Sequence, residues 1–188
     1  RASARTGLSK YTQGETSWLA GTTTGNSAGG RDGWLLRTAG DVGDLLPYDL
    51  RFGGAADDEF WDGKTAEDGS AIAVGSTASS GAGLSDGWLV SVDMAGNLSE
   101  TQTWGGTGDD SFRRLLPLPD GRMALLGTWD AKGQPQFWLV LREADGTTSF
   151  DKPLGPGTFW HAIWQEPGQI LLAGAAGPVE NGVRVMAV

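Results

Sequence analysis

Short segments, in which apolar residues either alternate with polar ones or run together for four or five positions, follow one another along the whole chain. Turn dipeptides such as Asp68-Gly69 and Asp120-Gly121 separate them. This pattern is typical of β-strands joined by tight hairpins rather than of helices. We expect no helix. In the best-defined part of the chain the pattern predicts four strands, over residues 58–66, 71–76, 87–93 and 98–104.

The same order of segments occurs four times. An apolar segment that ends in glycine, first present as Trp18-Leu19-Ala20-Gly21-Thr22, returns with its glycine at positions 75, 127 and 174. A second segment follows each copy of the first. In three units it contains a tryptophan, at Trp34, Trp88 and Trp138, and in the fourth unit it is weaker, as Gly182-Val183-Arg184-Val185. Four-stranded units of roughly 50 residues are typical of β-propeller blades.

We therefore predict an all-β chain that forms a single β-propeller or part of one. About four blades of four antiparallel strands are expected, at about 1–53, 54–105, 106–155 and 156–188. The last blade is incomplete, because the chain stops at its third strand, Val183–Val188. An edge strand without a partner exposes backbone hydrogen-bonding groups. We expect a protein partner, or the remaining part of the same precursor, to cover that edge.

One stretch resembles a known family. Gly105-Gly106-Thr107-Gly108-Asp109-Asp110-Ser111-Phe112, followed by Leu126-Gly127-Thr128 and Trp138-Leu139-Val140, is similar to a bacterial β-propeller repeat family with Gly-Gly-x-x-Asp-Asp blade starts (SBBP-like repeats). The first unit lacks the Asp pair, and the fourth has Gly155-Pro156-Gly157-Thr158-Phe159 instead. The resemblance implies a propeller fold and an extracytoplasmic, secreted or multidomain bacterial setting. It implies no particular reaction.

Composition removes several classes of function. The 188 residues include no cysteine and carry a formal net charge of -9. Because an acidic chain with scattered basic residues lacks the positive surface that binds phosphates, we expect no nucleic-acid partner. No apolar run approaches the roughly 20 residues of a membrane span. The chain opens at Arg1 without Met or a signal peptide, and we interpret it as a processed part of a larger protein.

Acidic pairs begin the second and third units, as Asp57-Asp58 and Asp109-Asp110. Carboxylates beside glycine-rich loops are the oxygen ligands that calcium prefers, so these four are the metal candidates. The favoured interpretation is structural, because aspartate at a turn accepts backbone N–H groups and no calcium-loop spacing is present. We expect no cofactor, with calcium as the alternative. Arg113-Arg114 is expected to balance the second pair.

The remaining candidates are aromatic and lie outside the repeat pattern. Trp34, Trp88 and Trp138 occupy one repeated position and are predicted to pack in the core between sheets. Long loops over 22–32, 76–86 and 128–135 share one rim, which we expect to be the binding face. The candidate ligand or partner contacts are the tryptophans that break the repeat and the single histidine: Trp61, Trp129, Trp160, Trp164 and His161.

The sequence therefore predicts a non-catalytic β-propeller interaction or scaffold module that binds a protein partner or another segment of its precursor. Neither a Gly-x-Ser-x-Gly elbow nor a serine triad pattern accompanies His161. Two alternatives stay open. One is a carbohydrate-binding propeller that uses exposed tryptophan, and the other is a hydrolase or lyase with an acidic site in the channel.

Overall fold

The computed structural model describes residues 5–13, 16–25, 27–39, 44–165, 168–175 and 183–187. These residues form fifteen strands and no helix, which confirms the prediction of an all-β chain. None of them belongs to a helix that could cross a membrane. The strands lie in four antiparallel sheets, and in each sheet they pair in the order in which they occur along the chain.

The four sheets follow one another along the chain. The first contains β1 (Arg5–Gln13), β2 (Thr16–Thr23), β3 (Asp32–Ala39) and β4 (Asp44–Phe52). The second contains β5 (Asp58–Thr65), β6 (Ala71–Thr77), β7 (Asp86–Val92) and β8 (Leu98–Trp104). The third contains β9 (Ser111–Pro117), β10 (Met123–Asp130), β11 (Pro135–Arg142) and β12 (Thr148–Pro156). The fourth contains β13 (Thr158–Gln165), β14 (Gln169–Ala175) and β15 (Val183–Ala187).

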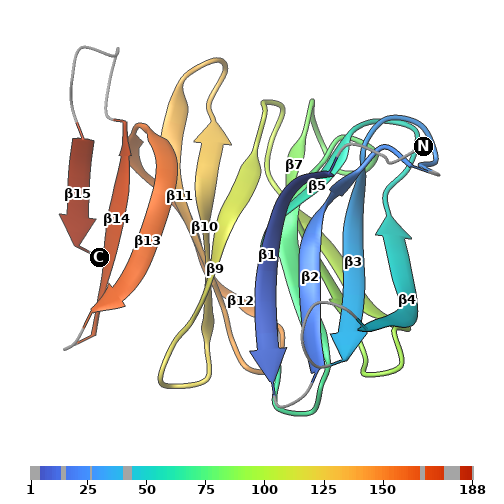
Figure 1. Ribbon diagram of the computed structural model, residues 1–188. Helices are drawn as coiled ribbons and strands as arrows, with labels where there is room; N and C mark the ends of the chain where they lie inside the picture. The colour runs from blue at the N-terminus through green and yellow to red at the C-terminus, as the bar shows by residue number, and fades with distance from the viewer. Residues whose placement is uncertain are drawn as a thin grey trace.

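The first strand of each later sheet packs against the first three strands of the sheet before it. β5 packs against β1, β2 and β3, β9 against β5, β6 and β7, and β13 against β9, β10 and β11. Hydrophobic clusters fill the three spaces between successive sheets. Figure 1 shows the first sheet at the right and the fourth at the left, and the sheets do not close into a ring.

An aromatic stack across three strands anchors the second and third sheets. Trp88 lies opposite Gly75, which lies opposite Phe60, and the two rings stack over the glycine with centroids 4.8 Å apart. Phe112 and Trp138 repeat this arrangement at 4.5 Å. Each stack packs against a glycine of the preceding sheet, where a Cβ would touch the rings; these glycines are Gly33 and Gly87.

The repeated tryptophans are buried. Trp88 and Trp138 pack between successive sheets, as the sequence predicted, whereas the cluster that contains Trp34 is formed by residues of the first sheet alone. Each of the three tryptophans donates its indole N–H to a side chain on the fourth strand of its own sheet, so that its polar atom is satisfied inside the core. The bonds are 2.5 Å from Trp34 to Asp49, 2.9 Å from Trp88 to Thr101 and 2.7 Å from Trp138 to Asp151.

The strands run between two different ends of the molecule. The turn end carries the hairpins between first and second strands and between third and fourth strands, including tight turns at 66–70, 93–97, 118–122 and 143–147. The loop end carries the connections between second and third strands and those that lead to the next sheet. It lies at the top of Figure 1.

Two sequence expectations are corrected by the strand register. The loop expected over 128–135 is short, because β10 continues to Asp130 and β11 begins at Pro135. In the fourth sheet Arg184, not Val183, lies opposite Gly174, where the other sheets have tryptophan. The fourth marker is therefore misaligned by one residue, a shift that moves every side chain to the other face of a strand. Without a tryptophan in the segment, nothing in the sequence marks the correct register.

Candidate functional site

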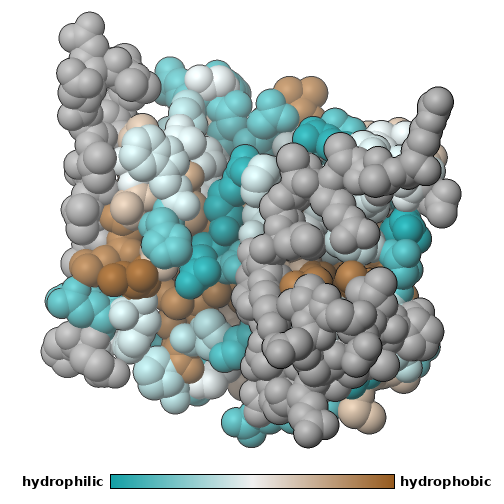
Figure 2. Space-filling view, in the orientation of Figure 1, coloured by the Kyte–Doolittle hydropathy of each residue, from teal (hydrophilic) through white to brown (hydrophobic). Residues whose placement is uncertain are grey.

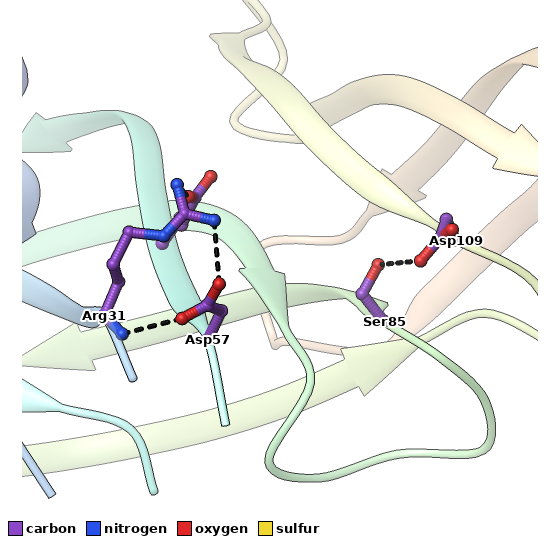
Figure 3. Close-up of polar contacts among 5 residues, drawn as sticks. Arg31, Asp57, Ser85 and Asp109 are labelled. Carbon is purple, nitrogen blue, oxygen red and sulfur yellow. Dashed lines mark hydrogen bonds and ion pairs between the residues drawn. The ribbon is translucent and has the colours of Figure 1, made fainter. Parts of the chain in front are cut away.

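The first acidic residue of each pair holds a loop of the preceding sheet. Asp57 accepts hydrogen bonds from the backbone N–H of Arg31 at 2.8 Å and from its guanidinium at 2.9 Å. In the equivalent place, Ser85 donates its hydroxyl to Asp109 at 3.2 Å. Figure 3 shows both contacts. The hydrogen bonds from Arg31 lower the pKa of the Asp57 carboxyl. Both aspartates are exposed, so they fasten loops at the surface.

The second acidic residue of each pair is fully buried and holds the turn into the next sheet. Asp58 accepts the backbone N–H of Gly54 at 2.7 Å. Asp110 accepts the backbone N–H groups of Gly106 and Asp130, both at 2.6 Å. These contacts are those expected of a structural aspartate at a blade start.

Each buried aspartate has a second carboxylate beside it, from the third strand of the preceding sheet. A Cβ on Gly53 would touch both Asp32 and Asp58, and the negative charge of Asp86 acts on Asp110. Desolvation by burial raises the pKa of Asp86 and of Asp110. The four predicted metal candidates do not converge on one point, and the described residues contain no group of three or more potential metal-ligating side chains.

A pocket of about 810 Å³ opens at the loop end between β5, β9 and β13. Trp61 and Trp160, which are 40% and 58% exposed, line it. Arg113 lies in the same lining, with its guanidinium carbon 3.8 Å from the centroid of the Trp61 ring. Although Arg113 is exposed as a residue, the protein around its guanidinium excludes part of the water, and this desolvation lowers its pKa.

The rest of the pocket wall is mostly polar. Asp109 and Asp130 contribute carboxylates, and Oδ1 of Asp130 is buried without a hydrogen-bond partner among the described residues. Figure 2 shows mostly hydrophilic residues over the upper part of this face of the molecule and hydrophobic surface lower down. The lining also has five hydroxyl side chains, from Ser76, Ser85, Ser111, Thr128 and Thr158.

The structure separates the remaining predicted site residues from this pocket. Trp129 and Trp164 are half-buried and pack against the hydrophobic clusters on either side of the third sheet. His161 is exposed on β13 and is not part of the pocket lining. Of the five candidates, only Trp61 and Trp160 come together.

The expectation that Arg113-Arg114 balances the adjacent acidic pair is wrong. Arg114 forms an ion pair at 3.4 Å with Asp62, a residue of the neighbouring sheet, and Arg113 stacks on Trp61. Arg113 was missed as a site residue, although the sequence carries a signal for it. Trp61, Arg113 and Trp160 each follow a phenylalanine at the same position of a first strand. An alignment of the first strands of the units would therefore have identified Arg113.

The edge of the fourth sheet is a second feature of functional interest. β15 pairs with β14 alone within the described part of the chain, whereas β3, β7 and β11 each pair with a fourth strand. Val188, at the end of the predicted edge, lies outside the described residues.

Neither a scan against models of known protein families nor a search of curated protein sequences found a match for this chain.

Proposed function

We propose that the chain is a non-catalytic interaction module built from β-propeller blades, which binds a β-strand of a protein partner or of another segment of its own precursor. Two features support the propeller assignment. Each unit is a four-stranded or three-stranded antiparallel meander, and each packs against the next through the same three strands. Repetition of one packing relation is expected of blades arranged about an axis.

The observation that carries the proposed binding mode is that β15, among the described residues, pairs with β14 alone. Its backbone has hydrogen-bond partners on one side, from β14 over residues 183–187. An edge strand with a row of unpaired N–H and C=O groups pairs readily with an added strand. The equivalent position in the other three sheets is taken by β4, β8 and β12. A strand from a partner would complete the fourth sheet in the same way.

The placement of the acidic residues supports a non-catalytic role. The buried carboxylates of Asp58 and Asp110 are occupied by backbone N–H groups, and Asp57 is paired with Arg31. His161 lies on β13 outside the pocket that contains the exposed carboxylate of Asp109. The aspartates hold turns and loops together.

Hydrogen exchange tests the proposal directly. The probe is a synthetic peptide with the sequence of β8, Leu98–Trp104, which is the fourth strand of the second sheet. The peptide should slow amide exchange within residues 183–187, because alternate N–H groups of β15 would gain partners. The control is the same peptide with proline at alternate positions, which removes its N–H donors.

The mass of the chain in solution provides the second measurement. An open edge should make the isolated chain self-associate, and the peptide should reduce this association by occupying the edge. A monomer whose residues 183–187 are already protected would show that the chain covers its own edge. Unprotected amides that stay unprotected with the peptide present would exclude strand addition. Either result overturns the proposal.

A further inference from the structure

Three successive sheets carry the same irregularity on their first strand. The register of β5 with β6 shifts around Trp61, which has no residue opposite it. The register of β9 with β10 shifts in the same way around Arg113, and that of β13 with β14 around Trp160. A β-bulge redirects a side chain and often occurs beside a binding site. All three extra residues line the loop-end pocket.

Buried neighbours hold each bulge in place. The residue before each extra residue is a buried phenylalanine, in order Phe60, Phe112 and Phe159. Each phenylalanine lies opposite a glycine of the second strand, where a Cβ would collide with a carbonyl oxygen of the first strand; these are Gly75, Gly127 and Gly174. The packing of the sheets therefore fixes the bulges. As a result, the indoles of Trp61 and Trp160 and the guanidinium of Arg113 are held at the pocket by rigid strands.

We propose that this pocket binds a neutral saccharide, with the indoles of Trp61 and Trp160 against sugar rings and Arg113 between them as a hydrogen-bond donor. A sugar ring has an apolar C–H face that suits an aromatic side chain with an exposed face. Its hydroxyl groups both donate and accept hydrogen bonds. The pocket lies at the loop end of β5, β9 and β13, so this site is distinct from the edge of β15 and goes beyond the strand-binding function.

The polar lining matches a ligand with many hydroxyl groups. Arg113 offers N–H donors, the serine and threonine side chains offer both donors and acceptors, and the carboxylates of Asp109 and Asp130 accept. A volume of about 810 Å³ falls within the range of small-molecule sites.

Charge favours a neutral ligand over an acidic one. The lining contains one cation, Arg113, and two carboxylates, Asp109 and Asp130. The whole chain has a formal net charge of -9. A uronate or phosphate would meet this negative potential, whereas the hydroxyl groups of a neutral sugar would not. Tryptophan and arginine also serve protein interfaces, but a pocket wall with five hydroxyl side chains suits a polyol better.

Calorimetric titration of the full chain tests the inference. The probes are neutral di- to tetrasaccharides of glucose, mannose, galactose and xylose, with the matching uronic acid oligomers and an unrelated peptide as comparisons. At least one neutral oligosaccharide should bind, and Trp160→Ala should weaken it about tenfold or more by removing one stacking surface. Trp61→Ala should weaken it similarly. Because Trp160 is largely exposed, Trp160→Ala should remain folded, which a melting curve checks.

Ile163→Ala is the matched control, since Ile163 is an exposed apolar residue of the same strand that does not line the pocket. It should leave saccharide binding unchanged. The inference is overturned if no neutral saccharide binds, if Trp160→Ala binds as tightly as the unchanged chain, or if an acidic oligomer or the peptide is preferred. None of these results depends on the edge of β15, so this inference and the proposed strand binding fail independently.

Discussion

The turn end and the loop end use the same residue, aspartate, in opposite physical settings. At the turn end, Asp68, Asp120 and Asp145 are exposed and Asp93 is half-buried. Each accepts the backbone N–H of a residue two to four positions later. Hydrogen bonds from the side chains of these same later residues, together with the backbone bonds, lower the pKa of all four carboxyls. A glycine with φ between 81° and 90° completes each turn, where the left-handed backbone favours glycine.

At the loop end the second aspartate of each pair, Asp58 or Asp110, is buried and hydrogen-bonded to residues far away in the chain. Asp110 accepts the N–H of Asp130 from the end of β10, and its own N–H donates to the carbonyl of Ser85 at 2.8 Å. Burial raises the pKa of the Asp110 carboxyl, whereas hydrogen bonds lower the pKa of the exposed turn carboxyl of Asp120. Turn aspartates therefore stabilise a local conformation, whereas the buried loop-end aspartates fasten one sheet to the next.

The largest effect is expected in the core that supports the loop end. Trp138 is buried, stacks on Phe112 and packs against Gly87 of the neighbouring sheet. Trp138→Ala should lower the free energy of unfolding by about 3 to 5 kcal/mol, because it leaves a large cavity between two sheets. Denaturant unfolding measures the change. Trp160→Ala is the control and should alter stability by less than about 0.5 kcal/mol. Equal midpoints for the two variants would contradict the assignment of the core.

A smaller effect should separate the two kinds of aspartate. Asp110→Ala leaves the N–H groups of Gly106 and Asp130 without their acceptor and should cost about 2 kcal/mol of unfolding free energy. Asp120→Ala removes contacts only within an exposed turn and should cost clearly less. Thermal or denaturant unfolding of both variants measures the difference. If Asp120→Ala were the more destabilising change, the distinction between the two ends would be wrong.

The pH dependence of stability should differ in sign between the ends. Burial raises the pKa of Asp86 in the folded chain, so its ionisation removes stability as the pH rises through that raised value. The pKa of Asp120 is lowered, so it contributes stability that is lost as the pH falls through the lowered value. Unfolding free energies should therefore be compared from about pH 7 to pH 3, around the ordinary aspartate pKa.

Two asparagine variants make this comparison specific. The stability of Asp86→Asn relative to the unchanged chain should decrease as the pH falls, because the unchanged chain loses the cost of a buried charge. The relative stability of Asp120→Asn should increase over the same range, because the unchanged chain loses a favourable charged hydrogen bond. Parallel pH profiles for the two variants would show that burial does not distinguish these carboxyls.

Local chemistry made the strands and turns predictable from the sequence. The predicted second unit agrees with β5 to β8 within one residue at each end, and the expected last strand matches β15 in position. Alternating polarity and turn residues act within a few positions, so a sequence window contains the whole signal. The repeat also predicted that Trp88 and Trp138 lie between sheets, because one position in each unit must face a neighbouring sheet.

Contacts between sheets decided the rest. The short loop between β10 and β11, the register of β15 and the carboxylate of Asp86 beside Asp110 depend on residues that are distant in the chain. The pocket depends in addition on bulges, which shift a strand by one residue and direct Trp61, Arg113 and Trp160 to the same place. Polarity patterns do not encode such shifts. The sequence by itself determined the strands, the turns and the repeat, whereas the tertiary structure brought the site together, because packing between sheets sets which residues of different units meet.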